Sequence, residues 1–160
     1  NQVTIRMNGL LFVIVLSAIS VKAIIGCSCA FQHYANEQEE QAAFVRDFNT
    51  TPYVFIGTVT SVTQKPLVQT PGVISFNMNP KIVHFKIEQN FKKNQQDLKE
   101  ITVKTASQDS MCGVGASVGE RMQVWAYGTG DTISISLCTR TTRWADQDIN
   151  RLQNLLNGTS

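Results

Sequence analysis

The feature that most constrains this chain is the placement of its four cysteines behind an apolar leader. Cys27 and Cys29 directly follow the leader, whereas Cys112 and Cys138 come much later. An even number of cysteines in a chain with a secretory leader implies two disulfides. Because Cys27 and Cys29 are too close to bridge one another comfortably, each is expected to tie the beginning of the domain to its later part. Four cysteines allow three pairings, and the spacing disfavours only the one that joins Cys27 to Cys29.

The leader itself predicts secretion. Residues 10–21 are apolar until Lys22, but they are too few for a membrane-spanning helix, which needs about 20 apolar residues. They match the apolar region of a signal peptide, with Met7 as the initiator and Gly26 as the small residue before the cut. We therefore expect residues 1–26 to be removed and the secreted domain to span 27–160. The alternatives are a retained membrane anchor and, from the lipobox-like sequence before Cys27, a lipoprotein.

The charge of the expected mature chain argues against two classes of partner. Removing residues 1–26 takes away Arg6 and Lys22, which leaves 12 basic and 12 acidic side chains. No block of five or six basic residues occurs, so neither nucleic-acid binding nor binding to an anionic membrane is indicated. The remaining length fits one domain with a real core.

Alternating apolar and polar residues predict an all-β fold with flanking helices. Gly57, inside the first predicted strand, indicates a bulge or a sharp bend. The proline-rich residues 64–80 are expected to form a long connection, and residues 92–96 a turn. The predicted strands are 53–62, 82–88, 100–105, 121–127 and 132–138, and the predicted helices are 34–48 and 145–156. Five strands between two helices predict a small closed or nearly closed barrel with the helices packed on it.

The sequence contains no convincing catalytic constellation. His33 and His84 are the only histidines, and neither belongs to a metal-ligand motif. All four thiols are expected to be oxidised, so none serves as a nucleophile. We therefore predict that the protein is not an enzyme and has no cofactor of its own. A zinc site made of the four cysteines is the alternative to the disulfides.

The chain contains two sequons for N-glycosylation, a modification of secreted proteins. They begin at Asn49 and at Asn157. Pro52 directly follows the first of them.

Three segments together carry a resemblance to a known family. They are Cys27-Ser28-Cys29 behind the signal peptide, residues 105–114 (TASQDSMCGV), and residues 133–138 (ISISLC) followed by Trp144. The combination resembles the tissue inhibitors of metalloproteinases, in a form with a single inhibitory, netrin-like domain. The similarity covers residues 27–145 by order of elements and 105–144 closely by residue. It implies a five-stranded OB-type barrel with disulfides Cys27–Cys112 and Cys29–Cys138, although the family's inhibitory domain usually carries six cysteines.

The resemblance also implies a function. A monomeric inhibitor, secreted to the extracellular space or matrix, would block matrix-type or related zinc metalloproteinases. The N-terminal amine and carbonyl of Cys27 would chelate the zinc of the protease, and Ser28 would enter the specificity pocket beside it. The implied protease contacts are Cys27, Ser28, Cys29, Ala30, Ala106, Ser107, Gln108, Asp109 and Ser110. The alternative is a netrin-like extracellular binding module that inhibits no protease.

Overall fold

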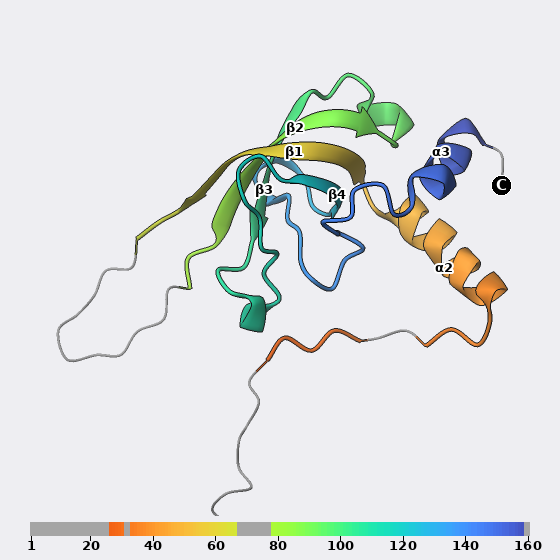
Figure 1. Ribbon diagram of the computed structural model, residues 1–160, viewed down its shortest axis with the longest axis horizontal. Helices are drawn as coiled ribbons and strands as arrows, with labels where there is room; N and C mark the ends of the chain where they lie inside the picture. Colours follow the sequence, from red (N-terminus) through yellow and green to blue (C-terminus); the bar gives the residue numbers. More distant parts are fainter. Residues whose placement is uncertain (1–25, 31–32, 67–77, 159–160) are drawn as a thin grey trace, which may run out of the picture.

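The computed structural model describes residues 26–30, 33–66 and 78–158. Four antiparallel strands form one sheet in the order β3-β2-β1-β4, and a helix lies before and after it in the chain (Figure 1). Residues 1–25 of the predicted signal peptide, with its initiator Met7, and most of the predicted connection 64–80 lie outside the described residues. Within the described part, no helix has both the length and the apolar character needed to cross a membrane.

Four of the five predicted strands are confirmed. They are β1 (Tyr53–Gln64), β2 (Lys81–Asn90), β3 (Glu100–Thr105) and β4 (Arg121–Ala126). The bulge predicted at Gly57 is also present, since the register of β1 against β2 shifts between Ile56 and Gly57. A Cβ atom at Gly57 would lie 2.8 Å from the carbonyl oxygen of Lys86, so this close approach of two strands requires glycine.

The predicted fifth strand and the closed barrel are wrong. Residues 133–135 make only isolated bridges, with Ser134 opposite Lys104 of β3 on one side and Tyr127, just after β4, on the other. The sheet therefore stays open. The chain enters this segment from a short 3-10 helix, η3 (Gly130–Thr132), and leaves it in a turn where the N–H of Thr139 donates to the carbonyl of Ser136. This turn ends the pairing of the alternating residues 132–138 and carries the chain to the disulfide at Cys138.

Both predicted helices are present, with shifted ends. Helix α2 (Glu37–Thr50) begins where the side chain of Asn36 accepts a hydrogen bond from the N–H of Glu39, at 2.9 Å. Such a cap satisfies an N–H group that the helix leaves unpaired. Helix α3 (Ile149–Asn157) begins after Asp148, because the residues before it form turns. The two helices lie beside one another at one end of the sheet (Figure 1).

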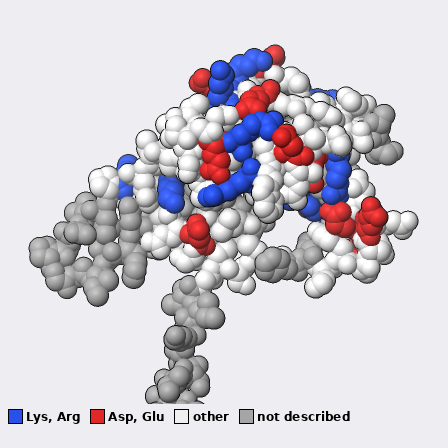
Figure 2. Space-filling view, in the orientation of Figure 1, with Lys and Arg blue, Asp and Glu red and all other residues white. Residues whose placement is uncertain are grey.

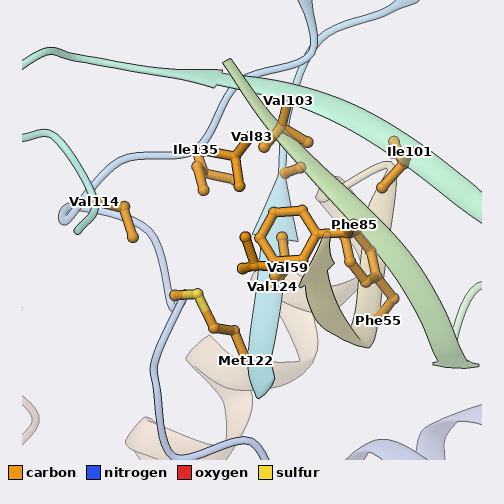
Figure 3. Close-up of a cluster of buried hydrophobic side chains, with 11 residues drawn as sticks. Phe55, Val59, Val83, Phe85, Ile101, Val103, Val114, Met122, Val124 and Ile135 are labelled. Carbon is orange, nitrogen blue, oxygen red and sulfur yellow. The ribbon is translucent and has the colours of Figure 1, made fainter. Parts of the chain in front are cut away.

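The sheet separates two hydrophobic clusters. The first lies on the face away from the helices and includes Phe55, Val59 and Phe85, whose side chains point toward one another (Figure 3). The second lies between the sheet and the helices and includes Phe44 of α2 and Trp125 of β4. Strand β1 contributes to both clusters because successive side chains point to opposite faces. Its central residues are therefore buried on both sides.

Candidate functional site

Two disulfides hold residues 27–29 against the later part of the chain. They join Cys27 to Cys112 and Cys29 to Cys138, with Cα atoms 4.9 and 5.2 Å apart. This is the pairing that the family resemblance implied. The bonds close sequence separations of 85 and 109 residues, so the beginning of the domain is attached directly to the region beyond β3. Disulfides of this kind are consistent with an extracellular protein.

The loop after β3 is built by local hydrogen bonds. The side chain of Thr105 accepts from the N–H of Val114 at 2.8 Å, and the carbonyl of Gln108 accepts from the N–H of Gly113 at 2.9 Å. Between them lies a single 3-10 turn, η2 (Asp109–Met111). Cys112 follows it with φ at 61°, in the left-handed region that few residues other than glycine adopt. This turn aims the Cys112 side chain toward the segment that contains Cys27.

Gly113 allows the backbone of this loop to pack closely against itself. A Cβ atom at this position would lie 2.3 Å from the carbonyl oxygen of Ala106 and 2.8 Å from that of Gln108. Because both neighbours are backbone atoms, no side chain can move aside to make room. The absence of a side chain therefore allows the two arms of the loop to approach each other.

Residues 27–30 and 108–112 together form a surface that we name the clamped ridge. Its exposed residues are Ser28, Ala30, Gln108, Asp109 and Ser110. Cys27, Cys29 and Cys112 are partly buried. The structure thus brings together most of the contact residues implied by the resemblance, from segments that are distant in the sequence.

Two of the implied contact residues lie apart from that exposed surface. Ser107 is only 5% exposed, and its hydroxyl lies 3.4 Å from the sulfur of Met111. Ala106 is partly buried beneath the loop. Ser107 therefore supports the loop from inside, and the exposed contacts on this arm are the three residues after it.

The clamped ridge carries little charge. Asp109 is its one acidic residue and it contains no Lys or Arg. On the face visible in Figure 2, basic and acidic side chains gather mainly over the sheet and the helices. One such group is Arg121, which lies 2.6 Å from Glu88 and 2.8 Å from Asp146. Hydrogen bonds from Thr58 and from Arg121 hold the pKa of Glu88 below its usual value.

A hollow of about 490 Å³ adjoins the clamped ridge, and the sequence did not predict it. Asp109 lines it on the side of the ridge, and Leu137 and Trp144 line it elsewhere. Trp144 is 76% exposed and Leu137 is 46% exposed. Exposed tryptophan is typical of protein-binding surfaces. Only the three-dimensional arrangement shows that these two apolar side chains lie beside the ridge.

The remaining candidates from the sequence lie away from the ridge or are already paired. His84 is on β2, where its Nδ1 lies 2.8 Å from the hydroxyl of Thr102, and His33 is exposed. The four cysteines form disulfides rather than the alternative zinc site. Asn49 and Asn157 are exposed near the ends of α2 and α3.

Comparison of the chain with models of protein families and with curated proteins gives no match.

Proposed function

We propose that this protein is a secreted inhibitor of zinc metalloproteinases that binds their active site through the clamped ridge. The observation that carries the proposal is that the two disulfides hold Cys27 beside Cys112 and Cys29 beside Cys138. Ser28 lies exposed between the first two cysteines, and Ala30 lies exposed after them. The proposal also rests on the resemblance of residues 27–29 and 105–114 to the tissue inhibitors of metalloproteinases.

The chemistry depends on cleavage between Gly26 and Cys27. Cleavage would create an α-amine on Cys27 with a pKa near 8, so that a neutral fraction exists at pH 7. Zinc favours the deprotonated form of a ligand further. The amine nitrogen and the carbonyl oxygen of Cys27 can then chelate the catalytic zinc of a protease, which keeps one position open for water. Displacing this water removes the nucleophile of the protease.

The exposed neighbours of Cys27 would provide the rest of the contact. Ser28 is exposed, so its small hydroxyl side chain is free to enter the specificity pocket beside the zinc. Ala30 would continue along the substrate cleft, while Gln108, Asp109 and Ser110 would contact its rim. Because the disulfides order these segments in advance, docking loses little conformational entropy.

The netrin-like, OB-type fold is part of the same proposal. Its support is the bridging segment 133–135, which bonds to both edges of the sheet. The segment runs parallel to β3 at Lys104 and antiparallel at Tyr127. A strand that joined β3 and β4 in a five-stranded barrel would make contacts of this kind, and the bridges support the proposal in this sense.

The proposal is tested by inhibition of a small panel of matrix-type metalloproteinases. The secreted protein is compared with a variant that carries one additional alanine before Cys27. We expect the first to inhibit and the second to lose inhibition, because the extra residue converts the chelating amine into an amide and displaces it from the zinc. Mass spectrometry of both proteins checks the N-terminus and the two disulfides.

The matched control for the variant with an additional alanine is a substitution at the next residue, Ser28. Ser28→Ala keeps the free amine and should change the preference among proteases without abolishing inhibition. If the processed protein has a free Cys27 amine and two disulfides but inhibits no protease on the panel, the proposal is wrong. The chain would then be better described as a netrin-like extracellular binding module.

A further inference from the structure

The four cysteine sulfurs form one compact cluster, although they belong to two separate disulfides. Their Sγ atoms all lie within 4.8 Å of one another. The Sγ atom of Cys27 is 3.8 Å from that of Cys29 and 3.8 Å from that of Cys138. The Sγ atoms of Cys138 and Cys112 are 3.6 Å apart. These are distances between sulfurs that are not bonded to each other.

Those separations match a tetrahedral arrangement of thiolates. Zinc binds four cysteine sulfurs at about 2.3 Å, which places the sulfurs about 3.8 Å from one another. Three pairs in the cluster already have about this spacing. The two bonded pairs would have to separate to this spacing. The sixth pair, Cys29 and Cys112, lies within 4.8 Å.

We propose that reduction of both disulfides converts the cluster into a four-cysteine site for Zn²⁺. Each disulfide takes two electrons and two protons from a dithiol reductant, which becomes a cyclic disulfide, so two dithiols yield four protein thiols. Binding of Zn²⁺ then releases the four thiol protons and forms four Zn–S bonds. This inference does not depend on protease inhibition.

Backbone contacts that do not involve the disulfides hold two of the four ligands in place. The N–H of Cys112 donates to the carbonyl of Asp109, and the carbonyl of Cys112 accepts from the N–H of Leu137, both at 2.9 Å. The N–H of Cys138 donates to the hydroxyl of Ser136 at 3.0 Å. Cys112 and Cys138 therefore stay close after reduction, and Cys27 and Cys29 need only return to them.

The cluster is also accessible. Cys138 is exposed and the other three cysteines are only partly buried, so a reductant and a metal ion can reach the sulfurs. A thiolate site selects zinc and other thiophilic ions over calcium and magnesium.

The experiment reduces the purified protein with a dithiol, removes the reductant under anaerobic conditions, and titrates the protein with Co²⁺ and then Zn²⁺. We expect the visible spectrum of tetrahedral thiolate-bound Co²⁺, its loss on addition of Zn²⁺, and one ion per chain. The oxidised protein should give no such spectrum. Cys138→Ser, which removes one ligand, should weaken Zn²⁺ binding by about tenfold or more, since even residues that only support ligands can account for that much.

Two further measurements distinguish a zinc site that the folded protein forms from the binding of zinc by the thiols of an unfolded chain. The reduced protein in urea should bind Zn²⁺ more weakly than in buffer, and equal affinity would overturn the proposal. Far-ultraviolet circular dichroism reports whether the reduced protein is folded. If it is unfolded without metal, Zn²⁺ should restore the spectrum of the oxidised protein, and failure to do so would also overturn the proposal. An octahedral Co²⁺ spectrum or an unchanged affinity of Cys138→Ser would do the same.

Discussion

The clamped ridge and the helix-covered side of the sheet are held in place by different forces. On the helix-covered side, Phe44, Trp125 and Leu152 are fully buried, and the rings of Phe44 and Trp125 pack edge to face at 5.4 Å. On the ridge, the exposed residues are small or polar, and two disulfides attach them to the domain. Apolar burial stabilises the first region, and covalent cross-links replace it in the second.

The difference teaches how an exposed surface can also be an ordered one. A segment that buries little apolar area gains too little free energy to offset its conformational entropy. The disulfides restrict the unfolded chain and so lower the entropy that the ridge loses on folding. The exposed residues of the ridge therefore stay ordered without packing against the core.

Substitution of the two tryptophans tests the comparison between the helix-covered side and the clamped ridge. It has the largest expected effect on the free energy of unfolding. Trp125→Ala should lower the free energy of unfolding by about 3–5 kcal/mol, because it leaves a cavity between the sheet and α2. Trp144→Ala, at an exposed position beside the ridge, should change it by no more than about 0.5 kcal/mol. Urea unfolding followed by circular dichroism measures both. Similar losses for the two variants would contradict the assignment of one side chain to the core and the other to the surface.

Removal of one cross-link tests the other region. In the double variant Cys29→Ser and Cys138→Ser, we expect the free energy of unfolding to fall by about 2–5 kcal/mol, since a bond that closes a long loop is lost. The far-ultraviolet circular dichroism at low urea should stay that of the unmodified protein, because the helices and the sheet are held by their own cores. Ser28→Ala lies on the same segment but removes no bond, and serves as the control. A double variant with unchanged stability would show that the bond does not stabilise the fold.

The loop of the ridge can also be changed without touching a disulfide. Gly113→Ala places a Cβ atom against two backbone carbonyls and should destabilise the protein by about 1–3 kcal/mol, in the range of overpacked sites. Gly115→Ala is the matched control, because its Cβ would meet only the end of the Arg143 side chain, which can move away. Thermal unfolding of both variants gives the comparison. Equal melting temperatures would mean that the loop opens easily, and that the ridge is less rigid than we infer.

The smallest expected effect is the pH dependence of stability that comes from Glu88, the partner of Arg121. Glu88 has a pKa lowered by Thr58 and Arg121, so its ionised form is stabilised by folding. This contribution is present above the pKa of the unfolded chain, near 4.5, and is lost as the pH falls through the lower pKa of the folded state. Because the Glu88 side chain is 38% exposed, solvent weakens the effect, and Glu88→Gln should cost about 0.2–1 kcal/mol at neutral pH.

The measurement for Glu88 is the stability of both proteins between neutral and acid pH. The difference between them should shrink as the pH is lowered, because protonation removes the same charge that the substitution removes. Glu100→Gln, at an exposed position on β3, is the control. A difference that grows toward acid pH would contradict the sign of the pKa shift.

Local patterns in the sequence determined most of the secondary structure. The alternation of apolar residues along β1 to β4 reflects faces that must be buried, and it gave the right strands because burial on a sheet follows the side-chain period of two. Gly57 indicated the bulge for a related reason, since only glycine permits the approach of the Lys86 carbonyl. The ends of the helices were less certain. The Asn36 cap begins α2 later than the helical pattern alone predicts.

Tertiary structure decided what the patterns could not distinguish. Residues 132–138 alternate as well as any strand, but only the residues around Ser134 pair with other segments. The 3-10 helix η3 before them and the turn from Ser136 to Thr139 after them end the pairing. Ser107 and Ser110 are both serines of the loop after β3, yet Ser107 is buried and Ser110 is exposed. Trp125 and Trp144 differ in the same way, because exposure depends on which distant segments cover a side chain. The sequence by itself determined that four cysteines would cross-link the domain. Only the folded chain decided that their sulfurs would gather in one accessible cluster at the clamped ridge, because that requires three distant segments to meet.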